Sequence, residues 1–328
     1  MNYDTAFAAF TKLFAHEMND TEMREFLVSM KLDESTSVDA IAAAATVMRS
    51  NAIALPVAPE LRPQLLDVVG TGGDKIGSFN ISSTVSLLCA SMGSYVAKHG
   101  SRSITSKSGS ADMFESLGVR LDLNIDQSAQ LLEESGFTFM FAQNHHPAMK
   151  FIMPVRKSIS EKTIFNVLGP LTNPAGVEKI MLGVFHKDFV SKIAQALAIN
   201  KVKSAMVVSS QEGMDEISIS DISFGARVDE SGISNFELDP TAYGIARYPL
   251  SSIVGGDAKE NAQILHNIFN NVATDAQRDI VLINAANAFI VDGKARDVQD
   301  GLEIAREALH SKRAHNKLEE IIRVSQKL

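Results

Sequence analysis

The sequence predicts an α/β protein in which a small all-helical domain accompanies a larger α/β domain with a mostly parallel central sheet. Residues 1 to about 60 show helical periodicity and no strand pattern. From Leu65 onward, short apolar runs alternate with helical stretches, which is typical of parallel strands joined by crossover helices. We expect the helical domain to comprise residues 1–63 with a second visit at about 146–172, and the α/β domain to comprise residues 64–145 and 173–328.

Within the first segment, one helical face carries large apolar side chains, namely Phe7, Phe10, Phe14 and Met18. Asn19 with Glu22 resembles a capping box, which predicts a second helix. An alanine-rich third helix is expected from Ile41 to Met48.

The α/β segment contains five short apolar runs that we interpret as strands: Leu65 to Val69, Tyr95 to Ala97, Thr138 to Phe141, Ile180 to Val184 and Ala205 to Val208. Residues 223–250 alternate in polarity around a predicted turn at residues 230–232. A capping pattern from Thr274 to Gln277 predicts the start of a C-terminal helical region.

Composition excludes several classes of protein. The 328 residues are 45% hydrophobic and carry a net charge of −8, which disfavours general affinity for nucleic acid. The single cysteine, Cys89, cannot form an intramolecular disulfide or a cysteine-based zinc site. The N-terminus lacks the basic and apolar pattern of a signal sequence, and no uninterrupted apolar run is long enough to cross a membrane. We therefore expect a cytoplasmic enzyme.

A glycine-rich loop follows the first predicted strand, from Asp67 to Asp74. Its glycines can adopt positive φ and let backbone N–H groups approach an anion closely. The spacing of Gly70, Gly72 and Gly73 fits neither the Walker loop nor the dinucleotide-binding fingerprint. A tight structural turn is the alternative interpretation at this point.

A second anion site is predicted at the polar segment from Ser78 to Thr84, just before an apolar helical run from Val85 to Ala90. Hydroxyl and amide groups there would lie at a helix N-terminus, where unpaired N–H groups favour negative charge. Two such sites in one stretch suggest a ligand with two phosphate groups.

The segment from Lys98 to Asp112 contains three cations, two glycines and six hydroxyl side chains, without hydrophobic periodicity. Small and charged residues in such a loop suit contact with a polyanion, and Lys98 and Arg102 are the candidates for phosphate contact. A solvated surface loop is the alternative. His99 is equally consistent with a structural role.

Asp215 and Glu216 follow the fifth predicted strand. In open α/β sheets the carboxyl ends of the strands face a crevice, and Mg²⁺ is commonly held there by one or two carboxylates plus substrate phosphates. An ordinary acidic loop is the alternative, which the phosphate loops upstream disfavour.

A proline-containing region carries His145, His146 and Arg156, and leads into a segment containing Gly169 and Pro170. Neighbouring histidines with no third ligand nearby make a metal site improbable. Arg156 could clamp a carboxylate in a bidentate manner, with an aromatic ring resting on Gly169 and Pro170. A surface arginine on a helix is the alternative.

Together these motifs resemble the anthranilate phosphoribosyltransferase family over nearly the whole chain. They are Gly-Thr-Gly-Gly-Asp, Asn-Ile-Ser-Ser, Lys-His-Gly-x-Arg with Ser-Lys-Ser-Gly-Ser-Ala-Asp, His-His-Pro-Ala-Met, and Phe-Asn-x-Leu-Gly-Pro-Leu-Thr-Asn-Pro, in the family's order. The resemblance implies a nucleoside phosphorylase/phosphoribosyltransferase-like fold, a homodimer, and a site in the cleft between the domains. It also implies phosphoribosyl transfer from phosphoribosyl pyrophosphate (PRPP) to anthranilate, the second step of tryptophan biosynthesis, with Mg²⁺.

The resemblance also implies roles for individual residues. The residues that would bind PRPP are Gly70, Gly73, Asp74, Ser78, Asn80, Ile81, Ser82, Ser83, Lys98, Arg102, Ser106 and Ser110. Lys98 and Arg102 would position the donor and its leaving group, with no general base assigned. The residues that would bind anthranilate are Gly70, Ser101, His146, Arg156, Gly169 and Pro170. Ser82, Asp215 and Glu216 would hold the metal ion.

The chain departs from the family pattern at two places, both on the acceptor side. Ser101 stands where the family usually has asparagine, and residues 159–163 read Ile-Ser-Glu-Lys-Thr where the family typically has Leu-Gly-x-Arg-Thr. Two other functions remain open from the sequence: a pyrimidine nucleoside phosphorylase, and a non-catalytic nucleic-acid-binding member of the same fold. The carboxylate pair argues against the first, and the net charge argues against the second.

Overall fold

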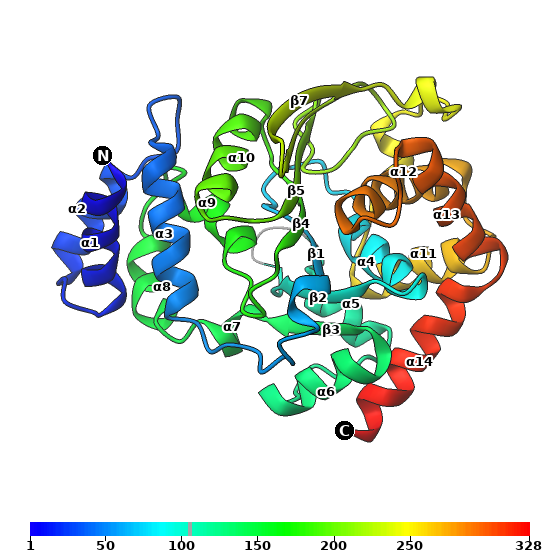
Figure 1. The fold of residues 1–328 in the computed structure, drawn as a ribbon, viewed down its shortest axis with the longest axis horizontal. Coiled ribbons are helices and arrows are strands. Elements are labelled where there is room, and N and C mark those ends of the chain that lie inside the picture. The colour runs from blue at the N-terminus through cyan, green and yellow to red at the C-terminus, as the bar shows by residue number, and fades with distance from the viewer. Residues whose placement is uncertain (104–106) are drawn as a thin grey trace.

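Within residues 1–103 and 107–328, which the computed structural model describes, seven strands form one central sheet (Figure 1). The strands are β1 (Leu65–Gly70), β2 (Tyr95–Gly100), β3 (Phe137–Phe141), β4 (Lys179–Gly183), β5 (Ser204–Ser210), β6 (Ser223–Asp229) and β7 (Gly232–Leu238). Their order across the sheet is β3-β2-β1-β4-β5-β6-β7. The pairs from β3 to β5 are parallel and the last two are antiparallel, so the prediction of a mostly parallel sheet is confirmed.

The sheet has a topological switch point between β1 and β4. From β1 the chain adds β2 and β3 on one side, and then returns to add β4 and β5 on the other. Crevices at the carboxyl ends of strands that flank such a switch point are the usual ligand sites of open α/β sheets. The register places Gly70 opposite Gly183 at this edge.

Three helices open the chain: α1 (Tyr3–Phe14), α2 (Asp20–Ser29) and α3 (Val38–Ser50). The predicted capping box is present, because Asn19 caps α2 and Glu22 returns the hydrogen bond. The predicted apolar face is partly wrong. Phe10 and Phe14 are buried, but Phe7 is 38% exposed, because the buried stripe of α1 is centred on Ala6, Phe10 and Leu13.

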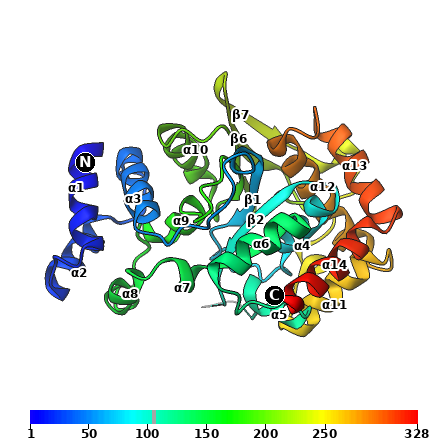
Figure 2. The same ribbon diagram turned by 60° about the horizontal axis from the view of Figure 1, so that its bottom comes forward.

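The chain returns to these helices after β3, through α7 (Ala142–His145), α8 (Met149–Lys157), α9 (Phe165–Leu168) and a 3-10 turn at Gly169–Leu171. Helix α8 packs against α1 and α2, and α9 packs against α3. The four helices α1, α2, α3 and α8 lie together on one side of the molecule in Figures 1 and 2. The exact domain boundaries at residues 63, 146 and 172 stay a prediction.

The remaining helices are α4 (Ile81–Ser91), α5 (Ser110–Ser116), α6 (Ile125–Ser135), α10 (Val190–Ile199), α11 (Ala258–Phe269), α12 (Asp275–Asp292), α13 (Val298–His310) and α14 (Arg313–Lys327). Short 3-10 turns lie at Arg62–Gln64, Lys187–Phe189, Pro240–Tyr243 and Leu250–Ile253. The predicted cap at Thr274 begins α12. In the part of the chain that the structure describes, no helix is long and apolar enough to span a bilayer.

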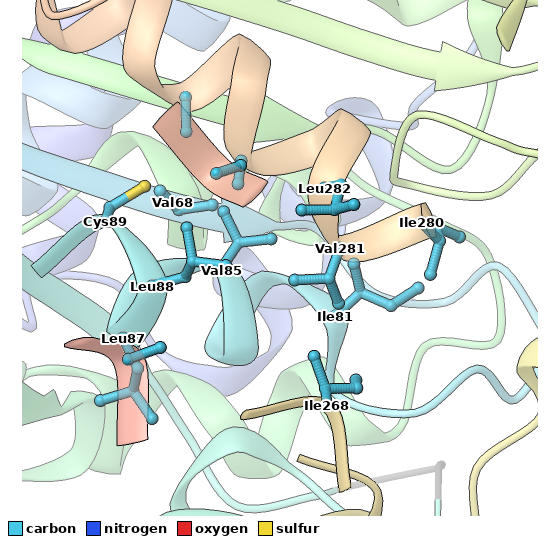
Figure 3. Close-up of a cluster of buried hydrophobic side chains, with 14 of the residues drawn as sticks. Val68, Ile81, Val85, Leu87, Leu88, Cys89, Ile268, Ile280, Val281 and Leu282 are labelled. Atoms are coloured by element: carbon cyan, nitrogen blue, oxygen red, sulfur yellow. The ribbon is translucent and has the colours of Figure 1, made fainter. Parts of the chain in front are cut away.

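Each face of the sheet has its own apolar core. On one face, side chains of β1 meet α4 and α12, as Figure 3 shows for Val68, Val85 and Leu282. On the other face, α10 and the N-terminal helices share a second core with Ile180 and Val207. The sheet is therefore rigidly held on both sides, and its strand ends are fixed in place.

One strand boundary was predicted wrongly. The sequence placed Lys98 and His99 in a loop, but β2 continues through both of them to Gly100. The polar residues fit a central strand because each has a buried partner. The Lys98 ammonium donates to the Val68 carbonyl, and the His99 ring lies against the Gly169 carbonyl.

Candidate active site

The region at the carboxyl ends of β1 and β4, called the crevice below, is built around two glycines and an aspartate. Gly70 ends β1 and Gly183 ends β4, and Asp215 lies directly over both. A Cβ on Gly70 would collide with the Asp215 carboxylate, and a Cβ on Gly183 would collide with its carbonyl oxygen. These glycines are therefore required so that the acidic segment after β5 can approach the strand ends.

The carboxylates of this segment contact both predicted phosphate sites. The Gly72 N–H donates to Asp215 Oδ2 at 2.7 Å, and the Ser82 N–H donates to Glu216 Oε1 at 3.1 Å. Glu216 thus lies at the N-terminus of α4, where the helix dipole favours negative charge. The structure brings together the glycine loop, the start of α4 and the acidic pair.

Lys98, on β2, is the cation of this cluster. It is 2% exposed, and its ammonium donates to the Val68 carbonyl at 2.6 Å and to Ser82 Oγ at 3.4 Å. Burial lowers the pKa of Lys98, whereas the charges of Asp67 and Glu216 oppose that shift. The lysine therefore supplies a cation at the base of the crevice.

Lys98 only partly offsets the negative charge of the acidic pair. Burial, followed by the charge of the nearby Asp74, raises the pKa of Asp215 to about 7. Burial and the charge of Asp215 also raise the pKa of Glu216 well above its ordinary value. A bound cation would relieve both effects.

The donor set of this pair fits Mg²⁺. Hard carboxylate oxygens are its preferred protein ligands, and one or two of them suffice when substrate phosphates complete the coordination. No three His, Cys, Asp or Glu side chains group into a complete metal cluster among the described residues. Two carboxylates with the Ser82 hydroxyl beside them match a site that a phosphorylated substrate completes.

The first glycine loop is anchored at both ends. Gly72 and Gly73 adopt positive φ, and the Gly77 carbonyl accepts from the Gly255 N–H at 2.9 Å. Ser78 forms a bridge with Val254. The 250–256 segment therefore fixes the loop, a role that the sequence did not indicate.

Asn80 connects the two predicted phosphate loops. Its Nδ2 donates to the Ser108 carbonyl at 3.4 Å, and its Oδ1 accepts from Asn261 of α11 at 2.8 Å. Sequence reasoning missed Asn261, because it lies 181 residues further along an ordinary helix. Nothing local marks it as part of the site.

Two predicted donor residues lie on the first turn of α4. The side chain of Ile81 is in the core beside Val281 and Ile268 (Figure 3), so only its backbone can face a ligand. Ser83 is 1% exposed, and its hydroxyl has no partner among the described residues.

The second loop is organised by Asp112, which accepts from the N–H groups of Ser103 and Gly109. Asp112 also pairs with Arg102 at 2.9 Å, and Glu115 binds the same guanidinium at 2.8 Å. Arg102 is therefore occupied by carboxylates of α5, and the structure does not bring it to the acidic pair.

Two further predicted donor residues belong to this second loop. The Ser110 hydroxyl donates to the Ser101 carbonyl at 3.4 Å, which holds the start of α5 against the end of β2. Ser106 lies outside the described residues.

At the acceptor end, Arg156 is half-buried on α8. Its guanidinium lies 5.7 Å from the centroid of the Phe165 ring and contacts Met153 Sδ at 3.8 Å. No carboxylate within residues 1–103 and 107–328 pairs with it. Burial lowers the pKa of Arg156 from its ordinary value. An anionic ligand would supply the partner that the protein does not.

Two buried histidines lie next to this arginine-bearing segment. The rings of His99 and His146 are 5.1 Å apart, and both Nε2 atoms lack a partner in the described part of the chain. Burial lowers the pKa of His99 to about 3 and that of His146 to about 4, so both rings are neutral. His99 Nδ1 lies 3.2 Å from the carbonyl of Gly169. A Cβ on Gly169 would meet no atom within 4 Å, so there is open space beside it.

Asp67 and Asn173 form a buried link that sequence reasoning missed. Asn173 donates to Asp67 at 2.7 Å and to the Ala97 carbonyl at 2.8 Å, and the His99 N–H donates to Asp67 at 3.3 Å. The link fixes the segment after Pro170 against β1 and β2. The available signal was Asp67 itself, because a charged residue inside an apolar strand needs a buried hydrogen-bond partner.

Comparisons with known proteins agree with this geometry. Residues 62–315 match the family described as glycosyl transferase family, a/b domain. An anthranilate phosphoribosyltransferase of Xanthobacter autotrophicus is 42% identical over 325 residues, which cover 99% of this chain and 93% of that relative. The corresponding protein of Persephonella marina is 40% identical, covering 95% of this chain and 91% of its own length.

Solved structures agree as well. The anthranilate phosphoribosyltransferase from Thermus thermophilus superimposes with a TM-score of 0.92 at 35% identity, covering 99% of this chain and 96% of that one. The enzyme from Saccharomyces cerevisiae in complex with PRPP and Mg gives a TM-score of 0.86 at 27% identity, covering 99% and 93%.

Proposed function

The chain belongs to the anthranilate phosphoribosyltransferase family, and from this premise we infer that its crevice brings PRPP and anthranilate together. It transfers the 5-phosphoribosyl group from PRPP to the amine of anthranilate. The products are N-(5-phosphoribosyl)anthranilate and pyrophosphate, in the second step of tryptophan biosynthesis. The observation that carries this function is the acidic pair Asp215 and Glu216, held by the glycine loop and the start of α4 over the buried Lys98.

The donor is proposed to bind along the switch-point crevice. Backbone N–H groups of the glycine loop and the hydroxyl groups at the start of α4 suit phosphate oxygens. The residues proposed to contact PRPP are Gly70, Gly73, Asp74, Ser78, Asn80, Ile81, Ser82, Ser83, Lys98, Arg102, Ser106 and Ser110. Arg102 would first have to leave Asp112 and Glu115, which supports a weaker role for it than for Lys98.

Ser82, Asp215 and Glu216 are proposed to hold Mg²⁺. When bound, the ion would neutralise charge on the pyrophosphate that leaves. The raised pKa of Asp215 supports this assignment, because a carboxylate that is costly to ionise alone gains from a cation.

Displacement of pyrophosphate at the ribose C1 is expected to pass through an oxocarbenium-like state. The protein then has to hold the donor and the amine in line and stabilise the leaving group. We assign the second task to the ammonium of Lys98, and its burial beside Ser82 supports this. An aromatic amine is nucleophilic when neutral, so no general base is required, and the low pKa values of His99 and His146 agree with that.

The acceptor is proposed to lie against the residues Gly70, Ser101, His146, Arg156, Gly169 and Pro170. Arg156 would bind the anthranilate carboxylate, since it lacks a carboxylate partner in the part of the chain described. The open space beside Gly169 supports a ring there.

An assay of anthranilate consumption tests the function directly. Loss of anthranilate fluorescence is followed after addition of PRPP and Mg²⁺, with one control that lacks the donor and one that lacks the metal. Fluorescence must fall only in the complete mixture. A nucleoside phosphorylase would leave anthranilate unchanged, and the relatives named above give no support to that alternative or to nucleic-acid binding.

A homodimer in the cytoplasm is also proposed. Phe7, Val28 and Phe151 are exposed apolar side chains on α1, α2 and α8. Burial of such side chains against a second copy would stabilise a dimer. Light scattering after size-exclusion chromatography would test it, and a mass of one chain would contradict it.

A further inference from the structure

Lys162 belongs to the helical part of the molecule, but its side chain extends to Phe185, just beyond β4 of the central sheet. Its backbone is fastened to the end of α2, because its carbonyl accepts from the Leu32 N–H at 2.8 Å and the next residue, Thr163, bridges to Lys31. The Ile164 N–H donates to the Met30 carbonyl at 2.9 Å. The backbone therefore moves with the helices α1, α2 and α8.

The side chain of Lys162 ends on the opposite wall. Its ammonium lies 3.3 Å from the centroid of the Phe185 ring, just beyond β4. The Phe185 N–H donates to Thr71 Oγ1 at 3.2 Å, which ties this wall to the glycine loop. A Cβ placed on Gly73 would have the Lys162 ammonium as its nearest atom, at 4.0 Å.

This ammonium lacks a protein anion. In the described ranges, no carboxylate lies within ion-pair distance of it. Desolvation and repulsion from Lys75 lower the pKa of Lys162, and Asp74 only partly opposes them. The backbone N–H groups of Gly73, Asp74 and Lys75 likewise have no acceptor among the described residues. Unpaired N–H groups and a cation therefore lie beside the same exposed loop.

We propose that Lys162 is a donor-binding residue supplied by the helical part, which contacts a phosphate group of PRPP held on the glycine loop 71–77. This rests on the proposed function. A lysine ammonium and backbone N–H groups are a common combination for phosphate. Donor binding then draws the segment after α8 against the loop.

The proposal has a consequence for the acceptor. Arg156 lies at the end of α8, only six residues before Lys162. A phosphate that fixes Lys162 also restricts the position of Arg156, so the donor should increase the affinity for anthranilate. The contact is thus a positioning link between the two substrate sites.

Calorimetric titration of PRPP with Mg²⁺, in the absence of anthranilate, tests the contact. Lys162→Ala should weaken PRPP binding about tenfold, as expected for loss of one charge-assisted contact. Lys162→Arg should bind within about threefold of the wild-type protein, because it keeps the cation. Lys31→Ala is the matched control, since it removes an exposed lysine one bridge away, and should leave PRPP binding unchanged.

Two results would overturn the proposal. One is unchanged PRPP affinity in Lys162→Ala. The other is a larger increase in KM for anthranilate than for PRPP, which would assign the lysine to the acceptor. Phe185→Leu separates charge from packing. It should weaken PRPP binding less than Lys162→Ala does, and an equal loss in the two variants would assign the effect to packing on the ring.

Failure of the transfer reaction would be seen separately. If the wild-type protein binds PRPP in a Lys162-dependent way but consumes no anthranilate, the proposed function is wrong and the contact stands. If it consumes anthranilate and Lys162→Ala binds PRPP normally, the contact is wrong and the function stands. Circular dichroism confirms that each variant is folded, which is expected because the Lys162 side chain is exposed.

Discussion

The donor half and the acceptor half of this crevice are built in different ways. On the donor side, Asp215 and Glu216 are already hydrogen-bonded to the glycine loop and to α4. On the acceptor side, Arg156 has no carboxylate partner in the described part of the chain, and the Nε2 atoms of His99 and His146 have no hydrogen-bond partner there. The donor half is therefore preorganised by strand ends and a helix start, whereas the acceptor half gains its polar partners only from a ligand.

Because of this difference, substitutions in the two halves should have different effects. Changes at Asp215 and Glu216 disturb carboxylates that already accept hydrogen bonds from other parts of the protein. Changes on the acceptor side remove a single ligand contact and leave the protein otherwise unaffected.

Replacement of the acidic pair should have the largest effect. We expect Asp215→Asn with Glu216→Gln to reduce kcat/KM by at least about a hundredfold at ordinary Mg²⁺, since preorganised charge at a leaving group is worth that much or more. The melting temperature should be unchanged or higher, because two desolvated like charges are removed. Steady-state kinetics over a range of Mg²⁺ and a thermal melt would measure both. Normal turnover with normal metal dependence would exclude the pair from the reaction.

Loss of the acceptor clamp should come second. Arg156→Ala is expected to raise KM for anthranilate about ten- to a hundredfold, because a charge-assisted hydrogen bond in a half-buried site contributes roughly 1.5–3 kcal/mol. KM for PRPP should change little. Steady-state kinetics with each substrate varied would show this. A larger defect for PRPP would mean that Arg156 serves the donor, and the contrast between the two halves would then be wrong.

The parts of this crevice differ in how well the sequence predicts them. Gly70, Asp215 and Glu216 were found because glycines and carboxylates at strand ends leave a local signal, and the parallel sheet brings those ends together. Asn261, Asn173 and Lys162 were not assigned roles, because each acts through a contact with a distant segment. The partners in such contacts cannot be read from the local periodicity of the chain.

The same limit explains the errors in the fold. The sequence suggested a loop at Lys98 and His99 because both side chains are polar. Their partners, Val68 and Gly169, lie on other elements and are not evident from the local sequence. Burial of polar groups depends on such partners, which a single sequence does not reveal.

The two halves should also respond to acid with opposite sign. Burial lowers the pKa of His146 to about 4, against 6.5 for the unperturbed ring. As the pH falls from 6.5 to 4, the unfolded chain takes up a proton that the folded protein does not, so stability is lost in that window and not above it. Asp215 acts oppositely: its raised pKa, about 7, means that acid favours its folded state.

A variant isolates the histidine contribution. Between pH 7 and 4.5, we expect the wild-type protein to lose on the order of 1–3 kcal/mol more unfolding free energy than His146→Gln does. Urea denaturation at several pH values would measure the difference. Parallel pH profiles for the two proteins would show that His146 is not the acid-sensitive group.

The smallest effect is expected from Ser101→Asn, which restores the residue that the family usually has. Ser101 is exposed, and its hydroxyl donates to the carbonyl of the neighbouring Arg102 at 3.1 Å, so the change costs the fold little. An amide at this position adds a donor and an acceptor beside the acceptor half, and the Asp215–Glu216 network is not touched. We therefore expect KM for anthranilate to fall by about threefold or to stay unchanged, with KM for PRPP constant, since one neutral hydrogen bond contributes about 1 kcal/mol or less. Steady-state kinetics would decide the point, with Ser101→Ala as a matched control that shortens the side chain. If Ser101→Asn instead weakened PRPP binding, Ser101 would belong with the donor residues and not with the acceptor residues.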